Sequence, residues 1–152
     1  DALAALDDAC QSALGDQVAQ CKAVRFTLLA RAGRVDEAVV VGDAILKSPL
    51  NPKQPAGLAW AILNSAPDQQ AAREFALRAA AMSDTALRGR DPMVATILAR
   101  AQYLNGRRSE AVETARRALS LADTPDMKEA ISIELRRYEE STGAPPLQPK
   151  QP

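Results

Sequence analysis

The segment AREFALRA at residues 72–79 returns 39 residues later as AVETARRA at residues 111–118. Five of the eight residue types are identical, and three of these are alanines spaced by four and then three residues. That spacing places the alanines on one face of an α-helix. Because alanine side chains are small, a neighbouring helix can approach this face closely. The two segments therefore predict equivalent helices, each packed closely against another helix.

An earlier copy of this pattern begins at Gly33. Residues 33–46 match residues 106–119 at six of fourteen positions. The equivalent alanines of the three copies are separated by 34 and then by 39 residues: Ala38, Ala72 and Ala111. We therefore expect a repeating unit of about 34 residues, whose second interval carries a five-residue loop insertion near residues 87–91.

Alanine and other strong helix formers dominate the composition, with 31 alanines among 152 residues. No segment alternates apolar and polar residues as a half-buried strand does. Instead, glycine, proline and asparagine divide the chain into segments of about 12–18 residues whose apolar positions are three and four apart, as in amphipathic helices. We therefore expect a single all-α domain over residues 1–140, built of antiparallel helical hairpins. The expected helices are 2–14, 17–31, 35–47, 55–65, 68–83, 92–104, 108–121 and 126–140.

The two ends of the chain are expected to differ from the repeats. Residues 2–31 predict an N-terminal hairpin. The last helix, 126–140, has an apolar stripe opposite charged residues, which is typical of a helix that caps the open end of a stacked array. Its apolar residues are Met127, Ala130, Ile131, Leu135 and Tyr138. Residues 141–152 contain four of the ten prolines and predict a flexible tail.

The repeat resembles the tetratricopeptide family, whose units are helix-turn-helix repeats of about 34 residues. The residues that carry the resemblance are Leu98-Ala99, Gly106, Ala111 and Ala118 in the third unit, Leu58-Ala59, Ala72 and Ala79 in the second, and Gly33 and Ala38 in the first. The resemblance covers residues 17–122 and implies a right-handed superhelix of hairpins, with the first helix of each hairpin lining a concave face. Gln102 stands where the family usually has Tyr. Ala76 and Ala115 replace the usual Phe or Tyr, and Gly42 is smaller still.

The composition also excludes several classes of function. The chain has no histidine, so it has no Ser-His-Asp or Cys-His catalytic group and no His-ligated metal site. Nineteen basic and nineteen acidic residues give no general attraction to nucleic acid or to an anionic membrane. No apolar run approaches the ~18 residues of a membrane span, and no phosphate-binding or nucleophile motif occurs. We expect no enzyme activity, cofactor, metal, nucleic-acid partner or direct membrane insertion.

Four residues are candidates for partner binding: Trp60, Asn64, Arg100 and Tyr103. Trp60 is the only tryptophan, and the tetratricopeptide pattern implies that its position leans toward the concave face. Arg100 and Tyr103 are three residues apart on one helix face, and with Asn64 they would form a patch suited to a peptide. The alternatives are that Trp60 packs as core under the proline-rich linker before its helix, and that Arg100 and Tyr103 belong to a solvated face.

Cys10 and Cys21 lie on either side of a Gly15-Asp16 break, each five residues from it. In an antiparallel hairpin their side chains could therefore face each other. Alanines near both cysteines would allow the close approach that a disulfide requires. A bridge would close a loop of about 12 residues, contribute about 2–3 kcal/mol and indicate an oxidising compartment. The alternative is a pair of buried, reduced thiols in a cytosol.

Together these features predict a protein- or peptide-binding adaptor or scaffold domain, in the periplasm or another extracytoplasmic compartment of a bacterium. Leu58-Ala59-Trp60, followed by a degenerate hairpin and a cleaner repeat, also resembles the helical extensions of bacterial thioredoxin-fold envelope proteins. That resemblance implies an alternative function, an accessory domain that positions or dimerises a thiol-redox enzyme. Self-association as a structural module is a third alternative.

Overall fold

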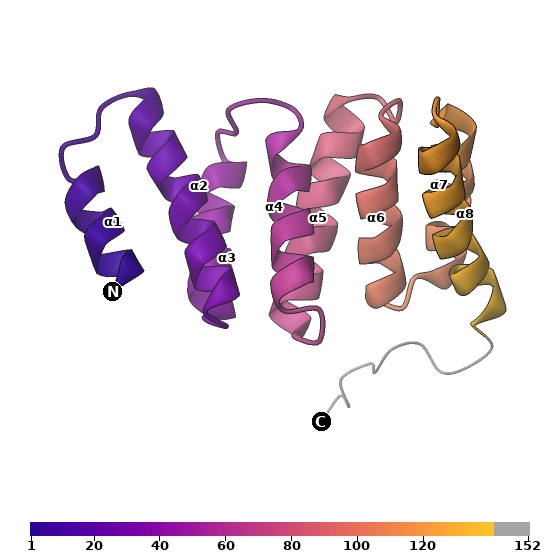
Figure 1. The fold of residues 1–152 in the computed structure, drawn as a ribbon, viewed down its shortest axis with the longest axis horizontal. Coiled ribbons are helices and arrows are strands. Elements are labelled where there is room, and N and C mark those ends of the chain that lie inside the picture. The colour runs from indigo at the N-terminus through magenta and orange to yellow at the C-terminus, as the bar shows by residue number, and fades with distance from the viewer. Residues whose placement is uncertain (142–152) are drawn as a thin grey trace.

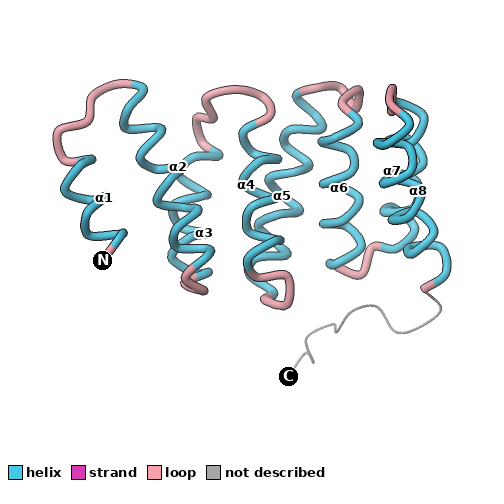
Figure 2. Tube along the Cα trace, in the orientation of Figure 1, coloured by secondary structure: helices cyan, strands magenta, loops and turns pink. Residues whose placement is uncertain are grey.

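The computed structural model describes residues 1–141, so the predicted tail over 142–152 lies outside the described residues. The described part of the chain forms eight α-helices and no strand, which confirms the expected all-α class (Figures 1 and 2). In chain order the helices are α1 (Ala2–Cys10), α2 (Asp16–Arg31), α3 (Val35–Leu46), α4 (Gln54–Ser65), α5 (Gln70–Ala86), α6 (Pro92–Leu104), α7 (Arg108–Leu121) and α8 (Pro125–Glu140).

The helices form a row of hairpins, with α1 and α8 at its two ends (Figure 1). In each of the hairpins α2–α3, α4–α5 and α6–α7, the second helix packs along the first. Helices α2, α4 and α6 lie side by side in one layer, and α3 and α5 lie side by side behind them. Helix α5 also packs against α6 and so joins successive hairpins.

The alanines that define the sequence repeat are buried between these helices. Ala38, Ala72 and Ala111 are all 0% exposed, as are Ala79 and Ala118 two turns further along the same faces. Side chains that end at Cβ leave little between two helix backbones, so adjacent helices can approach closely. The burial of these alanines agrees with the prediction that they mark helix–helix contacts.

The largest side chains of the main core meet over Gly42 in α3. Phe26 of α2 and Phe75 of α5 are fully buried, and their ring centroids are 5.4 Å apart. A Cβ atom on Gly42 would lie 2.5 Å from the Cζ atom of Phe75 and 2.8 Å from the Cε2 atom of Phe26. The space beside Gly42 is thus filled by rings from two neighbouring helices.

The first helix is shorter than the expected range 2–14, because it ends at Cys10. Residues 11–15 connect it to α2, and Leu14, which falls within the expected helix 2–14, lies in this connection and is 81% exposed. Gly15 has a φ of 58°, in the left-handed region that favours glycine, and α2 starts directly after it. The chain therefore reverses over a longer connection than the sequence pattern indicated.

The expected loop insertion near residues 87–91 is also incorrect. Helix α5 has 17 residues where α3 has 12, so the helix itself is longer. It begins at Gln70 rather than at residue 68 and continues past residue 83 to Ala86. Arg88 and Gly89 follow with φ values of 56° and 67°, and this left-handed turn ends the helix.

Asp91 caps the beginning of α6 and links it to α4. Its carboxylate accepts hydrogen bonds from the backbone N–H groups of Met93 at 2.9 Å and Val94 at 3.0 Å, and the Lys53 ammonium lies 2.8 Å away. Burial raises the pKa of Asp91, but Lys53 and the two N–H groups more than offset this, so the net pKa lies below its ordinary value.

The variant Asp91→Asn is expected to be about 0.5–1 kcal/mol less stable at neutral pH, because the amide can still cap α6 but carries no charge. A carboxyl group whose pKa is lowered by folding stabilises the protein above its unfolded pKa. That contribution is lost as the pH falls through the folded pKa. The difference between the two proteins should therefore be complete above about pH 5 and disappear in stronger acid. Urea unfolding at several pH values would measure it, and a pH-independent difference would contradict the assignment.

Candidate peptide-binding surface

Trp60 lies in the middle of α4 with its side chain toward solvent. Ala59, Ile62 and Leu63 of the same helix are in the core at 0% exposure, whereas Trp60 is 56% exposed. Trp60 is therefore not packed in the core, as the alternative prediction had it. Tryptophan is among the residues that most often dominate binding energy when a partner covers them.

Asn64, one turn after Trp60, is joined to Arg100 of the neighbouring helix α6. The Nη1 atom of Arg100 donates a hydrogen bond to Oδ1 of Asn64 at 2.7 Å, between residues 36 positions apart. At the other end of these helices, Lys53 pairs with Asp91. Helices α4 and α6 therefore lie side by side in the same direction, and Trp60, Asn64 and Arg100 belong to one continuous surface, which we call the α4–α6 surface.

Tyr103 is directed away from Trp60, toward the last helix. Its hydroxyl donates a hydrogen bond to Oγ of Ser141 at 2.9 Å, and its ring stacks on Tyr138 of α8 with the centroids 4.6 Å apart. Tyr103 also lines an open depression of ≈ 500 Å³ between α6 and α8. The structure therefore brings together three of the four predicted residues, and it gives the fourth, Tyr103, a role in holding α8.

Tyr138 is the buried partner of Tyr103 in this contact. It is 2% exposed, and Ile131 on the same stripe of α8 is 3% exposed, so this part of the stripe faces the preceding hairpin, whereas Ala130 of the predicted stripe is exposed. Burial raises the pKa of Tyr138 well above its ordinary value, and Glu134 adds to the rise, while the positive charges of Arg100 and Arg137 oppose it. The Tyr138 hydroxyl consequently stays protonated throughout the physiological range.

Two further residues of the α4–α6 surface were missed by the sequence reasoning. Met93, two turns before Arg100 on α6, is 55% exposed. Gly57, one turn before Trp60 on α4, is exposed, and a Cβ atom there would have no neighbour within 4 Å. The seven-residue spacing of Met93 and Arg100 was a usable signal, since such residues share a helix face. The surface thus carries two large exposed apolar side chains, Trp60 and Met93.

Charge is distributed unevenly among the helices, and α2, which lies in the same layer as α4 and α6, carries four charged residues. Helices α4 and α6 contain one charged residue between them, Arg100. On the helices behind them, charges occur in pairs of opposite sign, as in Arg78 with Asp43 and Arg117 with Asp84. Within residues 1–141, Arg100 has no carboxylate partner and bonds only to the neutral amide of Asn64.

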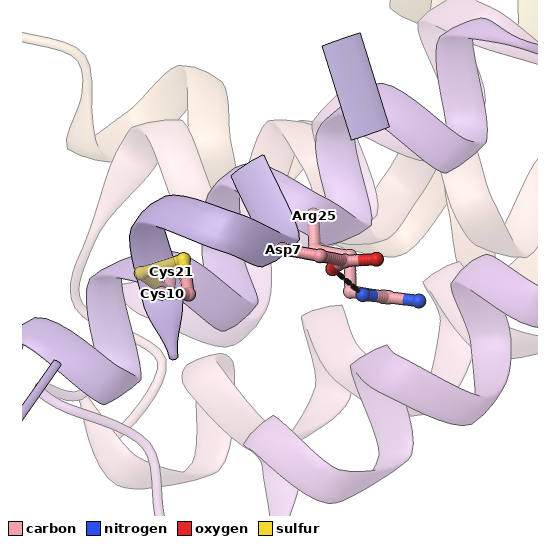
Figure 3. The surroundings of a disulfide bond; sticks show 4 residues. All are labelled: Asp7, Cys10, Cys21 and Arg25. Carbon is pink, nitrogen blue, oxygen red and sulfur yellow. Dashed lines mark hydrogen bonds and ion pairs between the residues drawn. A yellow bond between two sulfur atoms is a disulfide. The ribbon is translucent and has the colours of Figure 1, made fainter. Parts of the chain in front are cut away.

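Cys10 and Cys21 form a disulfide that ties α1 to α2 (Figure 3). Their Cα atoms are 6.0 Å apart, so the hairpin brings the two cysteines together as the sequence predicted. One turn further from the connection, Asp7 of α1 forms an ion pair with Arg25 of α2. Helix α1 contains no fully buried residue, although Leu3 packs partly buried against the main core, and the disulfide is its covalent link to α2.

Comparisons with protein-family models, with curated proteins and with solved structures found no match to this chain. Among residues 1–141, no helix combines the length and the apolar character that crossing a membrane requires.

Proposed function

We propose that the protein is a peptide- or protein-binding scaffold and that the α4–α6 surface receives the partner. The observation that carries the proposal is Trp60, 56% exposed beside the hydrogen-bonded pair of Asn64 and Arg100. Tryptophan and arginine are enriched among the residues that contribute most to protein interfaces. Trp60 and Arg100 lie on helices that pack into a core. The backbone at both residues is therefore already ordered, and binding would cost little additional conformational entropy there.

A tetratricopeptide-like organisation is part of the proposal. The hairpins α2–α3, α4–α5 and α6–α7 would be the three units, and α8 would cover the last of them. In that arrangement α2, α4 and α6 are the first helices of their units and line the concave face. The α4–α6 surface would then lie on the side that such arrays use for extended or helical segments.

We also propose an oxidising, extracytoplasmic location, such as the periplasm of a bacterium. The support is the disulfide between Cys10 and Cys21, because disulfides persist in oxidising compartments and are rare in the cytosol. The cysteines join two helices at the end of the row and lie apart from the α4–α6 surface, which favours a structural role for them (Figures 1 and 3).

Trp60→Ala is expected to weaken partner binding about tenfold or more, because it removes the largest exposed apolar side chain of the surface. Its effect on the melting temperature should be much smaller than that of removing the buried Phe75 ring. Proteins retained from an extract of the source cells by the immobilised wild type and by the variant would be compared by quantitative mass spectrometry.

Val40→Ala is a matched control, since Val40 is also an exposed apolar residue, at 71%, but belongs to α3 in the other layer. Partners retained by the wild type and Val40→Ala but lost by Trp60→Ala would support the proposal. Equal retention by all three proteins would contradict it.

A further inference from the structure

The charge of the α4–α6 surface restricts what can cover it. Across both helices Arg100 is the single charged residue, and it is partly buried beside Asn64. A guanidinium group has five N–H donors, and within residues 1–141 the side chain of Asn64 is the acceptor found for Arg100. The remaining donors still need acceptors when a partner excludes water.

Covering an arginine without a counter-charge leaves a desolvated cation, which is costly. A partner of uncharged or basic surface would therefore lose affinity at Arg100, whereas a carboxylate would form charge-assisted hydrogen bonds with the planar guanidinium. Glu134, an acidic residue of α8, is already paired with Arg137 at 3.2 Å. The carboxylate must then come from the partner.

The rest of the surface accepts apolar groups. Trp60 and Met93 are more than half exposed, and the missing side chain of Gly57 leaves open space one turn before Trp60. Trp60 lies four residues, about 6 Å along the axis of α4, from Asn64, and the Arg100 guanidinium reaches the Asn64 side chain from the neighbouring helix α6. Residues i and i+2 of an extended segment, or i and i+4 of a helix, span a similar distance.

We infer that the partner is a segment of another protein in which an apolar side chain lies about 6 Å from an Asp or Glu carboxylate. The apolar side chain packs on Trp60 and Met93, and the carboxylate accepts hydrogen bonds from Arg100, which Asn64 positions. The chain's own residues 142–152 contain no Asp or Glu and do not meet this requirement. This inference rests on the proposed function and specifies the chemistry of the partner.

The test is selection from a phage-displayed library of random dodecapeptides on immobilised full-length protein. The wild type is expected to enrich peptides with Asp or Glu close to Leu, Ile, Met or Phe. Arg100→Gln should keep the apolar preference and lose the acidic one. Arg116→Gln is the matched control, because Arg116 is an exposed arginine on α7 that pairs with Glu139, and it should select as the wild type does.

Individual selected peptides would then be titrated, with the emission of Trp60 as a reporter because it is the sole tryptophan. Replacing the peptide's acidic residue by its amide should weaken binding about tenfold to the wild type and to Arg116→Gln, and have little effect with Arg100→Gln. Circular dichroism and light scattering of each variant would establish that it is folded and monomeric.

The possible outcomes separate this inference from the proposed function. Enrichment of apolar peptides without acidic residues, or equal acidic enrichment by Arg100→Gln, would overturn the inference alone. Failure to enrich any peptide would overturn both. Self-association of the wild type that Arg100→Gln abolishes would assign the surface to a second copy and also overturn the inference.

Discussion

Reduction of the disulfide between Cys10 and Cys21 is expected to release α1 from α2 while the rest of the helices stay folded. The bridge closes a loop of about 12 residues, and the loop-entropy model assigns it about 3 kcal/mol. Helix α1 has nine residues and none of them is buried. An isolated helix shorter than about 12–15 residues is marginal in water, so the released segment should lose its helical structure.

Hydrogen exchange read by mass spectrometry would measure this release. Backbone amides of residues 2–10 should lose protection after a dithiol reductant is added, while those of α4 and α6 should keep it. A double variant, Cys10→Ser with Cys21→Ser, should show the same pattern without reductant. Alkylation of the protein isolated from its own cells should first find no free thiol.

Two results would contradict this view of α1. Unchanged protection of residues 2–10 after reduction would mean that packing, rather than the bridge, holds the helix. A large fall in the melting temperature of the whole chain would mean that α1 unfolds together with the core. The ion pair of Asp7 with Arg25 is not expected to hold α1 by itself, because both side chains are about half exposed and such pairs contribute about 0–1 kcal/mol.

Replacing Gly42 by alanine is expected to destabilise the protein by about 2 kcal/mol, because overpacking a well-packed core costs about 1–3 kcal/mol and at times more. The new Cβ atom would lie within 2.8 Å of ring atoms of Phe75 and Phe26, and both rings are fully buried. The higher helix propensity of alanine returns only about 1 kcal/mol of this.

Gly57→Ala is the matched control for Gly42→Ala. Gly57 is also inside a helix, but a Cβ atom added there would have no neighbour within 4 Å, so alanine should stabilise the protein by about 0.5–1 kcal/mol. Chemical denaturation of both variants should therefore give changes of opposite sign. Phe75→Leu removes ring atoms that the new Cβ atom would contact. Gly42→Ala should therefore cost less stability in the Phe75→Leu background than in the wild type. Equal effects at the two glycines would show that the rings can move aside.

Most of the fold could be predicted from local sequence. Spacings of three and four between apolar residues, together with glycine and proline breaks, predicted the eight helices of residues 1–141 in the right order. The ends were less predictable, because α1 stops at Cys10 and α5 continues to Ala86. Helix ends depend on the conformations of a few residues such as Gly15, Arg88 and Gly89, whose positive φ values are not encoded in the hydrophobic pattern.

The candidate site could be predicted only in part. The single tryptophan, the tetratricopeptide resemblance and helical spacing led to Trp60, Asn64 and Arg100, and the structure places them on one surface. The same reasoning grouped Tyr103 with them, although Tyr103 stacks on Tyr138 of α8. Residues 38 positions apart, such as Tyr103 and Ser141, meet only because α8 folds back against the preceding hairpin.

The sequence by itself determined the helical class, indicated the small-residue contacts at Ala38, Ala72 and Ala111, and placed Cys10 and Cys21 where a turn could bring them together. These properties follow from spacing along one chain segment or from equal distances to a turn. The tertiary structure alone decided that Trp60 stays exposed, that Arg100 bonds to Asn64, and that two rings fill the space beside Gly42. A periodic pattern identifies the face of a helix, but only the arrangement of neighbouring helices determines what covers that face.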